Sequence, residues 1–235
     1  MAAFFDLGGL DWCLWGDSFC GDDPGWSGWT NNGFGSWLFS DCALRQIDDT
    51  QRIATNWIGG MYSASLSWRN YFVFLRLGSH SRFTAADDAA AADDTFEQAY
   101  ASVFVRAFAE SETSGTALGG GYEVAFNLWE NAINVFGGDC GQPDARFKID
   151  GGHINLTAGV PYSVGLDVYD TNLRVYVDGV QYGEYNMSSK VCRSGSIGFR
   201  TFYSDMFAHN LTVANRSAVI ENSAAWGALS RARRR

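Results

Sequence analysis

Residues 161–213, PYSVGLDVYDTNLRVYVDGVQYGEYNMSSKVCRSGSIGFRTFYSDMFAHNLTV, decide the fold. Apolar side chains recur at every second position, which is the period of a β-strand with one buried face. The first two runs place on one face Val164, Leu166 and Val168, and then Leu173, Val175 and Val177. Residues 170–172 (Asp-Thr-Asn) and 178–179 (Asp-Gly) separate the runs with side chains that tolerate tight turns. The stretch therefore predicts antiparallel strands that are half buried.

The order of these pieces resembles the concanavalin A-like lectin/glucanase superfamily, in particular its laminin-G-like domains. The resemblance rests on residues 173–179 (LRVYVDG), 195–200 (GSIGFR) and 207–213 (FAHNLTV), with weaker similarity at 37–46 and 121–136. It implies an all-β jelly roll in which two antiparallel sheets pack face to face, with 37–46 as an early strand and 121–136 as a central hairpin. The superfamily holds lectins, glycosidases, lyases and adhesive modules, so the fold alone does not select a function.

Two further segments are predicted as strands. In residues 61–78 we expect Phe72 and Phe74 on the face opposite Tyr71, Val73 and the leucines that follow. In residues 96–110 the aromatic residues occupy one face and the small residues and valines the other; the β-branched valines favour a strand over a helix. The aromatic residues on that face are Phe96, Tyr100, Phe104 and Phe108.

Length and composition favour one domain. A single β-sandwich commonly reaches the 235 residues of this chain, and the 46% apolar content can fill a large core. We expect the sandwich to span residues 1–217, with a loop-rich N-terminal segment and an exposed acidic loop near 84–95. Residues 218–235 are expected to form a short helix and a basic end, SRARRR, that could contact an acidic neighbour or a second copy.

The charge argues against one class of partner, and the cysteines and sequons favour an extracellular protein. A net charge of −9 argues against a nucleic-acid partner, and no apolar run is long enough to span a membrane. Five cysteines without a CxxC pair favour disulfides over zinc, with Cys13–Cys20 the simplest local pair. Residues 1–6 do not look like a signal peptide, so display on a virion surface is also considered. The other cysteines are Cys42, Cys140 and Cys192, and the Asn-x-Ser/Thr sites are Asn155, Asn186, Asn210 and Asn215.

Carboxylates give weak support for catalysis. A glycosidase needs two acidic groups that flank one bond, and related glucanases place them on alternate positions of one strand. Here Glu123 and Asn127 share a face, whereas Glu130 falls on the opposite face unless the strand turns. Glu123 and Glu130 are therefore the only carboxylate pair proposed for a hydrolase. A lyase would use a tyrosine or histidine with cations; the residue types present are Tyr176, Arg174 and Lys148.

Calcium is the one metal that the resemblance implies, because related sugar-binding and laminin-G-like domains often hold it. Its oxygen ligands could come from Asp170, Asn172 and Asp178, with Asp167 nearby in the sequence, but turn formation explains these residues without an ion. The histidines lie near no nucleophile motif; His153 is expected in a turn and His209 as a structural residue within a strand.

Aromatic residues give the best functional indication. Tryptophan beside Gly, Asn and Asp can present a flat apolar face with polar partners, which suits a pyranose ring. The predicted ligand-binding residues are Trp26, Trp29, Trp37, Asn127 and Trp129. We therefore expect a non-catalytic module that binds carbohydrate or a glycoprotein surface, with a polysaccharide hydrolase or lyase and a structural coat or filament glycoprotein as alternatives.

Overall fold

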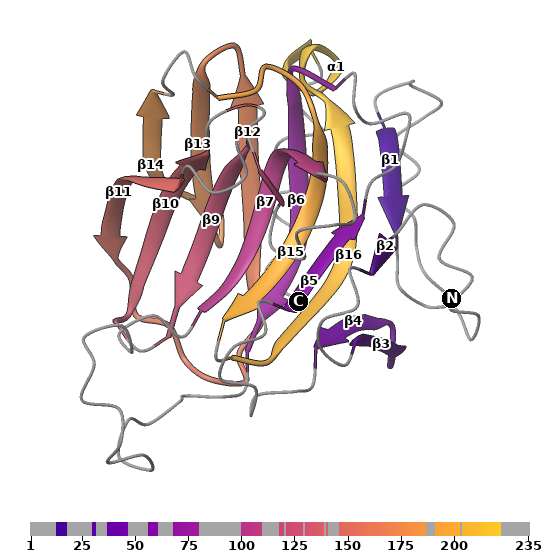
Figure 1. The fold of residues 1–235 in the computed structure, drawn as a ribbon, viewed down its shortest axis with the longest axis vertical. Coiled ribbons are helices and arrows are strands. Elements are labelled where there is room, and N and C mark those ends of the chain that lie inside the picture. The colour runs from indigo at the N-terminus through magenta and orange to yellow at the C-terminus, as the bar shows by residue number, and fades with distance from the viewer. Residues whose placement is uncertain are drawn as a thin grey trace.

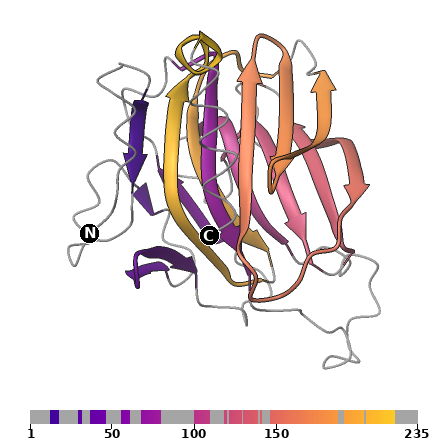
Figure 2. The ribbon, with the colours of Figure 1, turned by 180° about the vertical axis from the view of Figure 1, so that it is seen from behind.

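A computed structural model of the chain describes residues 13–17, 30–31, 37–46, 56–60, 68–79, 100–109, 118–119, 121–128, 130–138, 140, 146–186, 191–202 and 204–221. These residues form two antiparallel sheets stacked as layers, one in front in Figure 1 and the other in front in Figure 2. The all-β sandwich expected from the sequence is confirmed. No helix among these residues is long and apolar enough to cross a membrane.

The layer in front in Figure 2 is called sheet A, and its strands run in the order β14-β13-β12-β6-β16-β4-β3, with β1 beside β16. The bounds are β1 Cys13–Asp17, β3 Trp37–Ser40, β4 Ala43–Gln46, β6 Tyr71–Gly78, β12 Tyr162–Tyr169, β13 Asn172–Val177, β14 Val180–Asn186 and β16 Met206–Asn215. The second layer, sheet B, runs β11-β10-β9-β7-β15-β5-β2, with β8 beside β7. Its bounds are β2 Thr30–Asn31, β5 Asn56–Gly60, β7 Tyr100–Ala109, β8 Leu118–Gly119, β9 Tyr122–Asn127, β10 Ala132–Gly138, β11 Arg146–His153 and β15 Ser196–Phe202.

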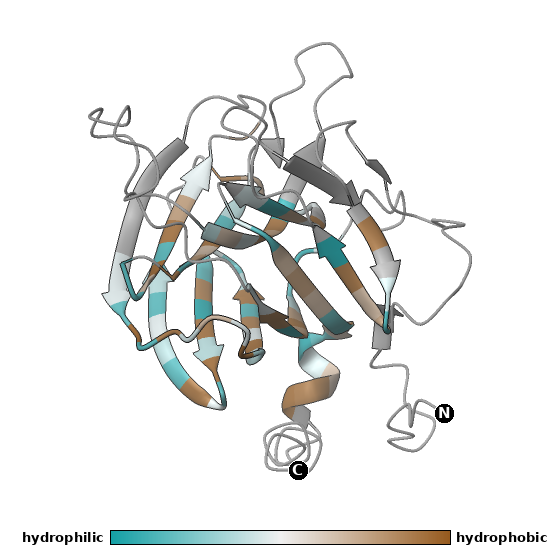
Figure 3. Ribbon diagram, turned by 90° about the horizontal axis from the view of Figure 1, so that it is seen from below, coloured by the Kyte–Doolittle hydropathy of each residue, from teal (hydrophilic) through white to brown (hydrophobic). Residues whose placement is uncertain are grey.

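The predicted alternation places one face of each sheet in a shared core. Val164, Leu166 and Val175 of sheet A are fully or almost fully buried in one apolar cluster with Val103 and Ile133 of sheet B. Bands of apolar and polar residues alternate along the strands when the sandwich is seen from below (Figure 3). The period of two in the sequence therefore identified which side of each strand faces the core.

Two hairpin turns use residues with positive φ. Asp178 and Gly179 join β13 to β14 with φ values of 46° and 85°, as the sequence predicted. Asp41 and Cys42 have φ values of 52° and 56° and join β3 to β4, which pair as a hairpin. Two consecutive positive φ values suit a tight turn between twisted strands. The prediction of a single early strand over 37–46 was therefore wrong.

Three other expectations can be compared with the described residues. β6 has Phe72 and Phe74 on the face opposite Tyr71, as predicted, and β7 is a strand with Tyr100 and Phe104 opposite the core-facing valines. His153, expected in a turn, instead ends β11. His209 lies in β16, and its Nδ1 is 2.9 Å from the carbonyl oxygen of Cys42. The acidic loop near 84–95 lies outside the described residues.

A buried arginine connects the two sheets. Arg106 interrupts the pairing of β7 with β15 as a bulge, and its φ of 55° lies in the left-handed region. Its Nη1 donates to the carbonyl oxygen of Asp170 at 2.7 Å, and its Nε donates to that of Arg69 at 3.2 Å. Its backbone N–H donates to the phenol oxygen of Tyr71 at 2.9 Å. Burial lowers the pKa of Arg106, which indicates that these contacts hold a costly cation in place.

We predict that Arg106→Met lowers the free energy of unfolding by about 3 kcal/mol, because several charge-assisted hydrogen bonds to backbone carbonyls are lost. Urea unfolding measures this change. The control is Arg76→Met, at an exposed position of β6, which should cost less than about 0.5 kcal/mol. Equal effects of the two substitutions would show that Arg106 does not join the sheets energetically.

Candidate ligand-binding site

The outer face of sheet B carries a row of polar residues. The strand registers align Asn134 of β10, Ala125 of β9, Ser102 of β7 and Arg200 of β15 across the sheet. Asn134 is 8% exposed and Ser102 is fully buried. This face therefore offers few polar atoms to a ligand in the observed conformation.

Glu123, proposed as one of a catalytic pair, lies on this face and is 2% exposed. Its Oε1 accepts a hydrogen bond from the hydroxyl of Ser102 at 2.8 Å, and its Oε2 lies 3.5 Å from Nη1 of Arg200. The chain turns after β9, so the carboxylate of Glu130 comes to Asn134 and accepts a hydrogen bond from its Nδ2 at 2.9 Å. Both carboxylates are thus engaged by neighbouring side chains, and Glu123 is closed to solvent.

The outer face of sheet A presents a different arrangement. Its strand registers align Ala214, Phe72, Asp167, Arg174 and Glu184 in one row across β16, β6, β12, β13 and β14. Apolar residues occupy the first half of this row and charged residues the second half. The middle of the row is therefore a border between an apolar and a charged surface.

Helix α1, Arg216–Glu221, follows β16 at the top of the sandwich (Figure 2). It packs on the apolar half of the row. Asn215 begins the helix by accepting a hydrogen bond from the backbone N–H of Ser217 at 3.0 Å. Val219 is buried against Phe72 and Phe74. The first helical residue, Arg216, donates from Nε to Oδ1 of Asp167 at 2.7 Å and from Nη2 to Oδ2 at 3.4 Å. The ion pair and the apolar contact together fix the helix over the sheet.

The charged half is a connected network. The Nε of Arg174 lies 3.0 Å from Oε2 of Glu184, and the phenol of Tyr169 donates to Oε1 of Glu184 at 2.7 Å. The guanidinium carbons of Arg174 and Arg216 lie 4.9 Å and 4.1 Å from the ring centre of Tyr169, in cation–π geometry. Each charged group therefore has an oppositely charged or aromatic partner.

The network shifts the pKa values of its two carboxyl groups in opposite directions. Burial raises the pKa of Asp167, and the hydrogen bond and charge of Arg216 oppose that rise. The hydrogen bonds from Arg174 and Tyr169 lower the pKa of Glu184. Burial and the hydrogen bond to Glu184 raise the pKa of the Tyr169 phenol, so it is not activated as a nucleophile.

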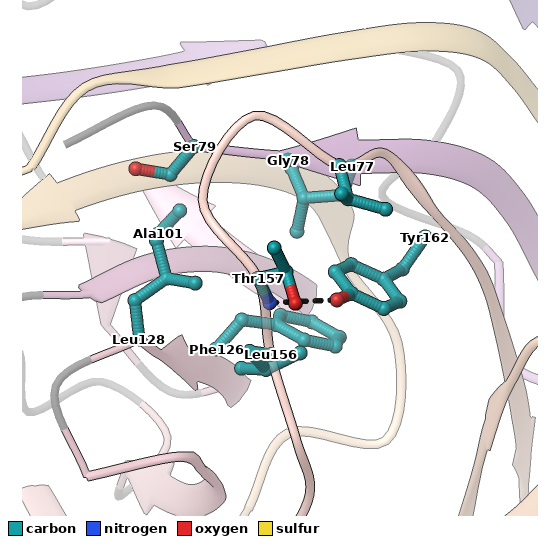
Figure 4. A pocket seen from close by; sticks show the side chains of 10 residues that line it. Leu77, Gly78, Ser79, Ala101, Phe126, Leu128, Leu156, Thr157 and Tyr162 are labelled. Carbon is teal, nitrogen blue, oxygen red and sulfur yellow. Dashed lines mark hydrogen bonds between the residues drawn. The ribbon is translucent and has the colours of Figure 1, made fainter. Parts of the chain in front are cut away.

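A hollow of about 330 Å³ opens between this network and the helix. Its apolar wall is Phe72, Val219 and Ile220, and its polar wall is Asp167, Arg174, Tyr176 and Arg216. The volume lies at the lower end of the range for small-molecule sites. A second cavity, between the sheets near Leu156 and Tyr162, measures only about 20 Å³, enough for a single water molecule (Figure 4). The hollow on sheet A is therefore the better candidate for a ligand.

The residues proposed for calcium do not lie together. Asp170 and Asn172 are at the start of β13, whereas Asp178 follows its end. The Oδ1 of Asp178 accepts a hydrogen bond from the backbone N–H of Ser163 at 2.9 Å, which is a turn role. The described ranges contain no group of three or more His, Cys, Asp or Glu side chains that could hold a metal ion.

The other predicted residues fall in several places. Asn127 is buried on sheet B, where its Oδ1 accepts from the backbone N–H of Glu130 at 2.9 Å. Trp37 begins β3, and Trp26, Trp29 and Trp129 lie outside the described residues. Of the lyase candidates, Arg174 and Tyr176 line the hollow on sheet A, whereas Lys148 belongs to β11 of sheet B.

The disulfide bonds and the exposed sequons agree with an oxidising compartment. Cys140 and Cys192 form a disulfide, and Cys42 is also disulfide-bonded; Cys20 lies outside the described residues, so the Cys13–Cys20 pair is not tested. Three of the glycosylation sequons are exposed, at Asn155, Asn186 and Asn210, and Asn215 is half-buried where it caps α1. The structure thus leaves three sequons accessible to modification.

The sequence analysis did not identify most of the residues that line the hollow. Arg174 and Tyr176 were named only as possible lyase residues, and Asp167 only as a residue near the calcium candidates. Arg216 and Ile220 carried no such signal, because only the fold brings the segment after β16 over β6 and β12.

No family model and no curated protein matches the sequence. Solved structures do match the fold. A carbohydrate-binding module, CBM66 from Bacillus subtilis, is similar with a TM-score of 0.60 and 13% identity over 80% of this chain and 96% of the other. A Bacillus subtilis protein of unknown function with a galectin-like fold also has a TM-score of 0.60 and 13% identity, over 86% and 96% of the two chains. The lumenal domain of VIP36, in a form bound to Ca²⁺ and Man3GlcNAc, has a TM-score of 0.54 and 10% identity over 80% and 83%. These similarities confirm the fold expected from the sequence.

We predict that Arg216→Met raises the pKa of Asp167 above its already raised value, because the hydrogen bond and charge that oppose the effect of burial are removed. A carboxyl group whose pKa is raised on folding stabilises the protein below its unfolded pKa and loses this contribution as the pH rises through the folded pKa. Carboxyl ¹³C NMR gives the midpoint of Asp167. The matched control is Arg45→Met, which breaks an exposed ion pair with Asp41 and should leave that midpoint unchanged. An Asp167 midpoint below 3.8, or one insensitive to Arg216→Met, would contradict the assignment.

Proposed function

We propose that this chain, whose fold is that of the concanavalin A-like lectins and glucanases, is a non-catalytic module that binds carbohydrate in the hollow between α1 and sheet A. The observation that carries this proposal is the composition of the hollow. A pyranose ring has an apolar C–H face and a rim of hydroxyl groups. Phe72, Val219 and Ile220 offer apolar contact on one side, and the phenol and guanidinium groups opposite them offer hydrogen bonds.

The size of the hollow supports a small ligand. About 330 Å³ accommodates one sugar ring, or two in a partly open site, but not a long polysaccharide chain lying fully enclosed. Recognition of a terminal or branching sugar is therefore the mode that the geometry favours. A carbohydrate-binding module and a VIP36 domain bound to Ca²⁺ and Man3GlcNAc share this fold, which supports a carbohydrate-binding role.

The carboxylates support binding rather than hydrolysis. A glycosidase needs one carboxyl group as a proton donor and a second on the other side of the bond. Asp167 is held through both oxygens by Arg216, and Glu184 is held by Arg174 and Tyr169. On sheet B, Glu123 is closed to solvent. We therefore propose no catalytic step.

The disulfide between Cys140 and Cys192 supports an extracellular or surface-displayed location. In such a location the partner would be a free glycan or a glycoprotein surface, and exposed sequons on the same chain would carry glycans of their own. We propose a single sandwich domain for residues 1–217, with the helical tail beyond it.

We expect the intact chain to bind a subset of a glycan array, and Ile220→Trp to weaken that binding at least about tenfold, which corresponds to ~1.4 kcal/mol. Ile220 is 52% exposed on α1, so a larger side chain can block the hollow without entering the core. Val180→Trp is the matched control, because Val180 is 67% exposed on β14 and does not line the hollow. Absence of any glycan binding by the unsubstituted chain, or equal binding by the two variants, would refute the proposed site.

A further inference from the structure

The accessible polar atoms of the hollow are mostly hydrogen-bond donors. The side chains of Arg174 and Arg216 are 31% and 23% exposed, whereas that of Asp167 is only 3% exposed. A ligand in the hollow therefore meets guanidinium edges and the phenol of Tyr176 before it meets the carboxylate. This asymmetry favours a ligand that brings its own acceptors.

Arg216 has N–H donors that its contacts with Asp167 do not use. Its Nε and Nη2 are both directed at Asp167, and its Nη1 takes no part in the contacts of Arg216 within the described part of the chain. A guanidinium presents its N–H groups in a fixed planar fork that matches a carboxylate. The remaining edge of Arg216 is thus suited to a second carboxylate, one supplied by the ligand.

The charged side chains around the hollow allow an anionic ligand to bind there. Asp167 is paired with Arg216 and lies 3.7 Å from Nη1 of Arg174, so its charge is countered on two sides. Glu184 lies across β13 on the far side of Arg174 and does not line the hollow. The hollow wall itself therefore carries two cations and one shielded anion, which favours an anionic ligand at the wall, although the whole network is already neutral because Glu184 pairs with Arg174.

We infer that the hollow is specific for an acidic sugar, a hexuronate whose carboxylate binds the free edge of Arg216 while its ring lies against Ile220 and Val219. This inference rests on the proposed function, which it narrows from carbohydrate in general to one class. A ligand with a carboxylate and no hydroxyl groups would use only the guanidinium of Arg216. The phenol of Tyr176 and the second guanidinium, Arg174, provide partners for the ring hydroxyls that an acidic sugar also carries.

The test is calorimetric titration of the intact chain with matched pairs: d-glucuronate against d-glucose, and d-galacturonate against d-galactose. We expect at least one uronate to bind about tenfold or more tightly than its neutral partner, because its carboxylate gains a charge attraction to Arg216 that the neutral sugar lacks. Added salt should weaken the binding of that uronate and leave the neutral sugar unaffected.

Two substitutions at the exposed rim give the control. Ile220→Asp removes apolar contact and places a negative charge beside the ligand carboxylate, so it should weaken uronate binding about tenfold more than it weakens binding of the neutral sugar. Ile220→Lys, at the same position and with a similar loss of apolar contact, should weaken uronate binding about tenfold less than Ile220→Asp does. Circular dichroism shows whether both variants are folded.

Three other results would contradict, respectively, the preference for an acidic sugar, the assignment to a sugar and the proposed function. Equal affinity for a uronate and its neutral partner would overturn the inference and leave the proposed carbohydrate site intact. Cyclohexanecarboxylate binding as tightly as the best uronate would overturn the assignment to a sugar. Binding of neither sugars nor acids would refute the proposed function itself, and the inference with it.

Discussion

The charge of Asp167 is the constraint on which the outer face of sheet A depends. A carboxylate that is 2% exposed must be paired, because an isolated buried charge is too costly for a folded protein. Arg216 supplies the first partner, and it can do so only if α1 starts directly after β16 and lies across β6 and β12. The helix then covers Phe72 and Phe74 and leaves the hollow beside them. The position of one acid thus determines both the packing of the helix and the shape of the site.

Sheet B meets the same requirement in a different way. Glu123 is paired with Ser102 and Arg200 within the sheet face, and Arg106 uses backbone carbonyls from loops of sheet A. These contacts stabilise the sandwich. Among the described residues the two faces therefore differ: on sheet B the carboxylate of Glu123 is buried against its partners, and on sheet A a guanidinium edge of Arg216 stays available. This difference explains why similarity of fold cannot by itself locate a binding site.

Much of the fold could be predicted from the sequence because strand faces follow a strict period of two. Val164, Leu166 and Leu173 faced the core as expected, and Asp178 with Gly179 formed the expected turn. The site was less predictable for a physical reason. Its walls come from β6, β12, β13 and α1, and strand pairing between segments about 90 residues apart sets their alignment. A bulge such as that at Arg106 also reverses the alternation locally, which no pattern of apolar residues indicates.

The most direct test of this account is a crystal structure of the chain with the uronate that it binds best. The account predicts the sugar between α1 and β13, with its carboxylate about 2.7–3.2 Å from Nη1 of Arg216 and its ring against Ile220. A sugar bound on the outer face of sheet B, or beside the tryptophans of the N-terminal segment with the hollow empty, would contradict it.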